Sequence, residues 1–252
     1  MGPERAAQVA IGAVAGVLSA LFGVGGGIMI VPALVSRGVP VKRAAATSLA
    51  AIGITGAVGA TRYGIAGQVV WRDALLVGLP AVAGVLLGTA LQKRISGPRL
   101  QIGFAVVMVI VALRLLTTSG TPTGSGGAGV AIALGLVGGV LSGLFGVGGG
   151  IVFVPALTLG LGLAQLTAEA TSLAAMVPVV CVGALRQHRV GLVDWRSGAV
   201  IGVASTAGVL VGVEIATSLS NDALRRGFAV LLLLTAAQLA QRARAQLRPA
   251  AT

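Results

Sequence analysis

The chain has 252 residues, of which 56% are hydrophobic and only 10% are charged. Soluble domains contain about 25% charged residues, so this composition excludes an ordinary soluble fold and predicts a polytopic integral membrane protein. The net charge of +12 does not indicate a nucleic-acid partner, because the basic residues form short clusters between apolar segments, as in the loops of membrane proteins.

The first half of the chain reads as a series of apolar segments. A helix is expected over 6–22, the run Gly-Val-Gly-Gly-Gly at 23–27 interrupts it, and a short helix follows over 28–36. A Gly/Ser/Thr-rich stretch at 118–128 reads as a flexible linker. Between the short helix and this linker lie three further segments that are long enough to cross a bilayer, at about 44–61, 74–91 and 100–116.

The second half repeats the first, which predicts an internal duplication. Residues 16–34 read GVLSALFGVGGGIMIVPAL and residues 139–157 read GVLSGLFGVGGGIVFVPAL. The glycine runs align at an offset of 123 residues, whereas Thr47-Ser48 aligns with Thr171-Ser172 at 124. We therefore predict a first repeat over 1–117, the linker at 118–128 and a second repeat over 129–252.

The broken helix pair decides how the repeats are oriented. Residues 6–35 would extend about 45 Å as helix, whereas two full crossings need about 40 residues. The pair is therefore either one broken crossing, which gives eight passes and parallel repeats, or a re-entrant hairpin, which leaves three crossings and makes the repeats inverted. The hairpin gathers the basic clusters near 37–43, 93–99, 186–196 and 242–248 on one side, as expected of cytoplasmic loops.

We therefore predict an all-α integral membrane fold of two homologous inverted repeats. Each repeat is a glycine-broken, re-entrant helix pair plus three transmembrane helices, or four passes if the pair counts as one crossing. The same charge pattern predicts that the protein lies in the cytoplasmic membrane with both termini in the cytoplasm.

The repeated break has the chemistry of an anion site. The helix that follows each glycine run begins with unpaired N–H groups at its positive dipole end, and consecutive glycines let such groups converge on an anion. Apolar segments broken by Gly and Pro at matching places in two halves are typical of transporter binding sites. The alternative is that the glycines only allow close helix crossing.

Hydroxyl groups near the breaks extend this candidate site. Thr47-Ser48 and its copy could donate to an oxyanion, although helix capping or helix–helix bonding explains them equally well. Ser19 and Ser142 precede the breaks and could contribute to the site, but a bond back to their own helix is expected for both. The candidate substrate-binding residues are Phe22, Gly23, Gly25, Gly26, Gly27, Thr47 and Ser48 in the first copy, and Phe145, Gly146, Gly148, Gly149, Gly150, Thr171 and Ser172 in the second.

Residue types that support catalysis or metal binding are scarce. Cys181 is the single cysteine and His188 the single histidine, so no disulfide or metal-ligand spacing exists, and no nucleophile is paired with a base. We expect no enzyme, metal or cofactor. None of the 6 acidic residues lies at the middle of an apolar segment, so no carboxylate is indicated as a proton relay.

The doubled LFGVGGG with its following Val-Pro, and the Ala-Thr-Ser-Leu segment that comes next in each half, resemble the sulfite exporter TauE/SafE family, also called the toluene sulfonate uptake permease group. The resemblance covers both halves. It implies a cytoplasmic-membrane transporter of small anions such as sulfite, sulfonates or sulfoacetate, commonly described as an eight-pass protein. The copies differ at Ala45 and Glu169, so the site need not be symmetric.

We therefore expect a secondary transporter that binds a small anion at the two breaks and works by alternating access. An uncoupled anion channel and, less favoured, a non-transport membrane subunit are the alternatives. The expected partners are the anion and the lipid bilayer. Coupling to a proton or another ion and assembly as a homo-oligomer are compatible with the sequence, but no residue indicates either.

Overall fold

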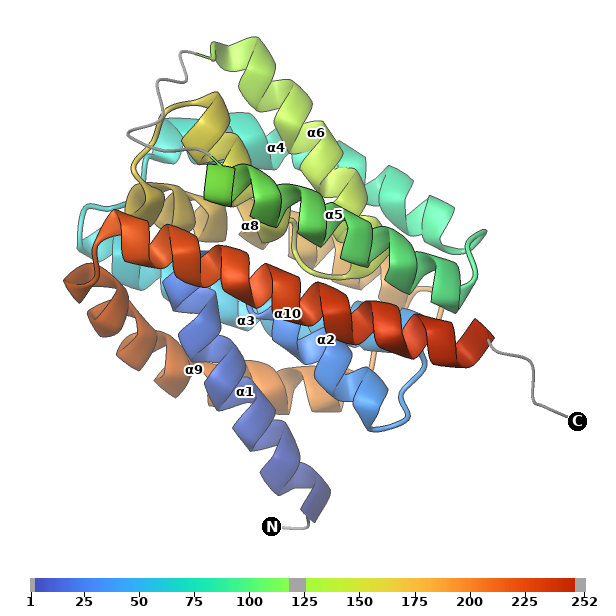
Figure 1. Ribbon diagram of the computed structural model, residues 1–252. Coiled ribbons are helices and arrows are strands. Elements are labelled where there is room, and N and C mark those ends of the chain that lie inside the picture. Colours follow the sequence, from blue (N-terminus) through green and yellow to red (C-terminus); the bar gives the residue numbers. More distant parts are fainter. Residues whose placement is uncertain (1–2, 118–125, 248–252) are drawn as a thin grey trace, which may run out of the picture.

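The computed structural model describes residues 3–117 and 126–247. Most of the predicted linker therefore lies outside the described residues. Within them every element is helical (Figure 1). The first half contains α1 (Pro3–Phe22), α2 (Gly27–Ser36), α3 (Val41–Ile65), α4 (Trp71–Gln92) and α5 (Gly97–Thr117). The second contains α6 (Ala128–Phe145), α7 (Gly150–Pro155), the π-helical turn η1 (Ala156–Gly160), α8 (Gln165–His188), α9 (Trp195–Ser218) and α10 (Asn221–Leu247).

The prediction of a polytopic helical membrane protein is confirmed. Eight helices are long and apolar enough to cross a membrane, and α1 and α6 are among them. The shorter apolar helices Gly27–Ser36 and Gly150–Gly160 add to these eight. Each broken pair therefore combines one helix of membrane-spanning length with one of about half that length.

The central helices of the molecule are α3 and α8, which pack against each other. In each, 67% of the spanning segment is buried, against 33–44% in the other six. Helices α1 and α9 pack together on the side of α3, and α4 and α6 pack together on the side of α8. Helices α5 and α10 lie side by side across one face (Figure 1). Helices α3 and α8 are equivalent elements of the two halves, as are α5 and α10, and the pair α1–α9 is equivalent to the pair α6–α4.

The two central helices run antiparallel. Gly59, near the end of α3, packs against Leu173 near the start of α8. At the opposite end Gly183 packs against Leu49. Because α3 and α8 are equivalent helices of the two repeats, the repeats place the same element in opposite directions.

Each central helix has parallel neighbours. Helix α9 runs parallel to α3. The hydroxyls of Thr55 and Ser205 lie 2.6 Å apart and, further along both helices, Arg62 pairs with Glu214. Helix α1 likewise runs parallel to α9, and α4 and α6 run parallel to α8. The contacts that fix these directions are Gly12 with Ile201, Gly212 with Val17, Gly135 with Val77, Gly143 with Val85, Val70 with Thr171, and Gln92 with Gln187. The equivalent helices α1 and α6 therefore also run in opposite directions.

Glycines bring the parallel neighbours into backbone contact. A Cβ on Gly16 would lie 2.2 Å from the carbonyl oxygen of Ser205, and one on the equivalent Gly139 would lie 2.1 Å from that of Ala81. Such close crossings are the usual way in which membrane helices gain packing energy. The pairs α1–α9 and α4–α6 therefore link the repeats to each other.

The chain turns back at each glycine run instead of continuing straight. A Cβ on Gly26 would lie 3.1 Å from Cβ of Ala15, and one on Gly149 would lie 3.3 Å from the carbonyl oxygen of Gly138. The first turn of α2 thus packs beside α1, and that of α7 beside α6. Both pairs are hairpins.

The π-helical turn η1 explains why the repeat offset changes from 123 to 124. A π turn accommodates one extra residue within a helix, and η1 lies between Pro155, which matches Pro32 at an offset of 123, and Thr171, which matches Thr47 at 124. The hydroxyl of Thr158 bonds the carbonyl of Val154 at 3.1 Å within this segment. The inserted residue is absorbed before α8 begins.

Inverted repeats can be tested by labelling single cysteines in a Cys181→Ser background. Arg37→Cys and Arg94→Cys follow helices that end at the same face and should react with an impermeant maleimide from one side of the membrane. Ala164→Cys, at the mouth of the second hairpin, should react from the other side. Reaction of all three from one side would contradict inverted repeats and support parallel ones.

Candidate functional site

The two glycine runs meet at the centre of the molecule. We call residues 23–28 tip 1 and residues 146–151 tip 2. A Cβ on Gly27 would lie 2.6 Å from Cα of Val147, and one on Gly150 would lie 2.5 Å from Cα of Val24, so the tips touch. Their backbones have the same shape, with positive φ angles that favour glycine at Gly23 (64°), Gly25 (66°), Gly26 (81°), Gly146 (72°), Gly148 (75°) and Gly149 (89°).

Both tips carry buried backbone N–H groups without a partner. Within the described residues, the N–H groups of 24–28 and 147–151 make no hydrogen bond to another group. Val24 is 0% exposed and Val147 2%. Buried N–H groups are nearly always paired with protein, water or a ligand. The tips therefore present two sets of donors, each at the start of a short helix, to whatever occupies the space between them.

Ser19 and Ser142 add an unpartnered hydroxyl beside each tip. Both are 0% exposed, and neither Oγ has a hydrogen-bond partner. The expected bond back to their own helix is therefore wrong for both. Each residue lies one turn before its break, since its carbonyl accepts the N–H of the first tip glycine at 2.8 Å.

The predicted hydroxyls of Ser48 and Ser172 reach the tips, but they bond to backbone oxygens. Ser48 Oγ donates to the carbonyl of Gly146 at 2.7 Å, and Ser172 Oγ donates to that of Gly23 at 2.8 Å. Each serine belongs to the repeat opposite the tip that it holds. These bonds fix the position of each tip against the central helix of the other repeat.

The predicted threonines lie one residue before these serines, and in this conformation they accept hydrogen bonds from the backbone just ahead of α9 and α4. Thr47 Oγ1 accepts the N–H of Asp194 at 3.1 Å, and Thr171 Oγ1 accepts that of Val70 at 3.0 Å. Asp194 and Val70 are the residues that precede α9 and α4. The alternative of helix–helix hydrogen bonding therefore describes this conformation, since neither threonine caps its own helix. Neither threonine hydroxyl donates a hydrogen bond to any group of the described residues.

The predicted aromatic residues pack the tips onto the outer helices. Phe22 stacks on Phe228 of α10 with ring centres 5.7 Å apart, and Phe145 stacks on Phe104 of α5 at 4.7 Å. Both rings are almost fully buried. Their contacts are with other rings rather than with the gap between the tips.

The gap itself is filled by two apolar side chains that the sequence analysis did not single out. Ile52 of α3 and Met176 of α8 occupy equivalent positions in the two repeats and are 0% exposed. A Cβ on Gly25 would lie 2.4 Å from Ile52 and 2.6 Å from the sulfur of Met176. Gly148 of tip 2 contacts the same two side chains. The centre is therefore closed in this conformation.

Glu169, which the sequence indicated only as a difference from Ala45 between the two copies, also contacts a tip. It is 0% exposed, and its backbone packs directly on tip 1, since a Cβ on Gly23 would lie 2.5 Å from Cα of Glu169. Its Oε1 accepts a bond from Nε2 of Gln165 at 2.8 Å, and its Oε2 has no partner.

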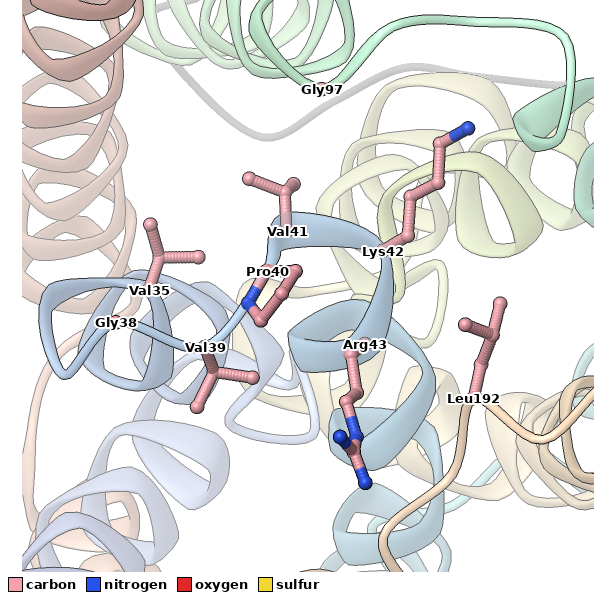
Figure 2. Close-up of a pocket in the computed structure, with 9 residues that line it drawn as sticks. All are labelled: Val35, Gly38, Val39, Pro40, Val41, Lys42, Arg43, Gly97 and Leu192. Carbon is pink, nitrogen blue, oxygen red and sulfur yellow. The ribbon is translucent and has the colours of Figure 1, made fainter.

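A basic cavity opens at the mouth of the first hairpin. It measures about 590 Å³ and is lined by the α2–α3 loop up to Pro40 and by Lys42 and Arg43 in the first turn of α3, with Leu192 opposite (Figure 2). A second cavity of about 340 Å³ shares part of this lining and extends to Arg37, Asp194 and Thr47. We call the two cavities together the vestibule.

The vestibule holds one carboxylate among its cations. Burial raises the pKa of Asp194, but hydrogen bonds from the Ser197 N–H and hydroxyl and from the Arg196 N–H, together with the charge of Arg43, lower that pKa below its usual value. Asp194 is therefore ionised at neutral pH. It bonds the start of its own helix, with Ser197 Oγ at 2.8 Å, so the cations of the α2–α3 loop remain the dominant charge.

Comparisons with known proteins point to a membrane transporter. The sequence profile of the family described as "Sulfite exporter TauE/SafE" matches residues 2–115 and 130–251. A "Probable membrane transporter protein" of Xylella fastidiosa (strain 9a5c) is 29% identical over 236 residues, which cover 89% of this chain and 90% of the relative. The "Probable membrane transporter protein YunE" of Bacillus subtilis (strain 168) is 26% identical over 260 residues, 92% and 95% of the two chains.

The close packing of the tips can be tested with two alanine variants that share a backbone conformation. Gly25 and Gly67 have φ angles of 66° and 70°, but a Cβ on Gly67 would meet nothing within 4 Å. Gly67→Ala should cost only the strain of about 1–2 kcal/mol. Gly25→Ala should cost about 1–3 kcal/mol more, because it overpacks Ile52 and Met176. Equal shifts of the thermal unfolding midpoint in detergent would show that the centre is loosely packed.

Proposed function

The chain belongs to the sulfite exporter TauE/SafE family, and from that premise we propose that it is a secondary transporter of small sulfur-containing or organic anions. The anions are of the sulfite and sulfonate type. They bind between tip 1 and tip 2 and cross the cytoplasmic membrane by alternating access of the site to the two sides.

The observation that carries this proposal is the matched set of unpartnered donors at the centre of the molecule. The N–H groups of 24–28 and 147–151 lie at the positive ends of α2 and α7, and the unpartnered hydroxyls of Ser19 and Ser142 belong to the turn that precedes each tip. Such ends hold anions without a full positive charge. A cation would be repelled there, so the donors select for negative charge.

The vestibule supports an anionic substrate and gives it a route. Arg37, Lys42 and Arg43 raise the local concentration of anions at its mouth. Its inner wall includes Thr47, whose neighbour Ser48 bonds tip 2 at 2.7 Å. An anion that enters from this face therefore arrives beside tip 2.

The closed centre supports alternating access over an open channel. The contact between the tips, filled out by Ile52 and Met176, blocks a continuous pore, and the bonds from Ser48 and Ser172 tie each tip to the opposite repeat. Opening on either side requires one tip to part from the central helix that holds it. Because α1 and α6 run in opposite directions, the same movement in the other repeat opens the other side.

The orientation in the membrane follows from the basic residues. Lys42 donates to the carbonyl of Lys93 at 3.3 Å, which brings the basic α2–α3 and α4–α5 loops to one face. Since cytoplasmic loops are enriched in Lys and Arg, this face and the vestibule belong to the cytoplasm. Both termini then lie on the cytoplasmic side.

Counterflow in proteoliposomes tests the proposal. Vesicles loaded with unlabelled sulfite or methanesulfonate should take up the labelled anion with saturable kinetics, and protein-free vesicles should not. Flux that does not saturate and shows no counterflow would support the channel, and absence of flux of either anion would overturn the sulfur-anion assignment.

Ser19→Ala and Ser142→Ala test the binding site in the same assay. Neither variant removes a hydrogen bond that the protein makes with itself, so both should fold. A hydrogen bond to an anion is worth about 1.5–3 kcal/mol, so each variant should raise the half-saturating concentration roughly 10- to 100-fold. Ser218→Ala, at an exposed hydroxyl that bonds the Ile215 carbonyl, is the control and should leave transport unchanged. Unchanged affinity in both tip variants would remove the hydroxyls from the site.

A further inference from the structure

The two tips differ in one buried residue that contacts them. A Cβ on Gly146 would lie 2.4 Å from Cα of Ala45, just as one on Gly23 would lie 2.5 Å from Cα of Glu169. Ala45 and Glu169 occupy equivalent positions at the starts of α3 and α8. The first repeat thus shows that this backbone packing needs only a methyl group, and the carboxyl of Glu169 is not required by the fold.

The carboxyl is also costly where it lies. It is 0% exposed, one oxygen has a single donor in Gln165, and the other has none. A buried charge that is neither paired nor fully hydrogen-bonded costs several kcal/mol. A feature that is both costly and dispensable for packing calls for a functional explanation.

The neighbouring elements supply little that would stabilise a negative charge. Tyr63 of α3 is close enough to interact electrostatically with Glu169, and its hydroxyl donates to the carbonyl of Ala20 at 2.8 Å in the last turn of α1. That turn is the negative end of α1. No titratable residue lies between Arg5 and Arg37 or between Arg114 and Glu169, so α2, α6 and α7 contribute none. Helix α1 carries its only titratable side chains, Glu4 and Arg5, in its first turn, at the end of the helix away from tip 1.

The charged residues of the elements packed against α8 form ion pairs with other groups or are at least partly exposed, as is Arg226 of α10. Arg62 pairs with Glu214 of α9, and on α10 Arg225 pairs with Asp222. Helix α4 begins with Arg72, which is exposed, and Asp73, which is half-buried. Neither ion pair includes Glu169.

We propose that Glu169 is the proton-binding residue that couples anion transport to a proton, an inference that rests on the proposed function. When the carboxyl binds a proton from the side to which the site is open, the negative charge beside tip 1 disappears and the anion can bind. The anion and the proton then cross together. Release of the proton on the other side restores the charge and expels the anion.

Gradient-driven uptake into proteoliposomes with pyranine inside tests this role. The probe is methanesulfonate, which stays ionised across the pH range and cannot carry the proton itself. If counterflow shows that the protein exchanges only sulfite, the probe is sulfite, and protein-free vesicles measure the background. In the unaltered protein an inward proton gradient should drive accumulation of the probe, and the lumen should acidify with uptake.

Glu169→Gln carries the permanently neutral side chain and should keep counterflow while it loses both accumulation and acidification. Glu169→Ala, which copies Ala45, should behave in the same way and provides a second variant with a packing already present in the other repeat. Asp222→Asn, an exposed acid on α10, is the control and should retain coupling.

The outcomes separate the two claims. Counterflow in the unaltered protein without any response to the gradient, or full gradient-driven accumulation in both Glu169 variants, would overturn the role of Glu169 and leave the transporter intact. Absence of counterflow in the unaltered protein would overturn the proposed function, and the inference with it.

Discussion

The structure depends on one constraint, which is that polar backbone groups inside a bilayer need partners. Eight helices satisfy it along their length, and the two tips do not. Their N–H groups at 24–28 and 147–151 are buried and unpaired. The surrounding helices hold the tips in place. Helices α3 and α8 each bond a serine to the tip of the other repeat, and α10 and α5 each stack a ring on the phenylalanine that precedes a tip. A fold that keeps such groups buried without internal partners is suited to a ligand that provides acceptors.

The duplication supplies a comparison within one molecule. Under the proposed function, features that appear in both repeats, such as the tip glycines, Ser19 with Ser142, and Ser48 with Ser172, serve to hold the anion and to move the tips. Features that appear once would then provide the asymmetry that directional transport needs. Glu169 has Ala45 at the equivalent position of the first repeat. The basic residues between α2 and the first turn of α3 have no charged equivalent in the second copy, whose loop at 160–165 is uncharged. The π turn η1 changes the mouth of the second hairpin further.

Much of the fold could be predicted because the signals were local and repeated. The observed helices extend the predicted segments by no more than a few residues at either end, and the doubled glycine run located the breaks. The partners of the polar groups could not be predicted, because they come from the opposite repeat. Ser19 was expected to bond its own helix, but it does not. Glu169 seemed peripheral from its place in α8, yet the tip of the first repeat covers it. The change of offset from 123 to 124 was visible, but only the structure shows that a π turn absorbs the extra residue.

The central claim is that the N–H groups of the tips bind the transported anion, and amide NMR of the protein in lipid bilayers tests it most directly. With ¹⁵N-labelled glycine, the amide signals of Gly25, Gly26, Gly148 and Gly149 can be followed while sulfite is added. If the tips bind the anion, these amide protons should shift downfield and saturate, as expected when an N–H group donates to an anion, while Gly67 and Gly191 in the outer loops should stay unchanged. Tip signals that do not respond to concentrations at which the protein transports sulfite would contradict the account.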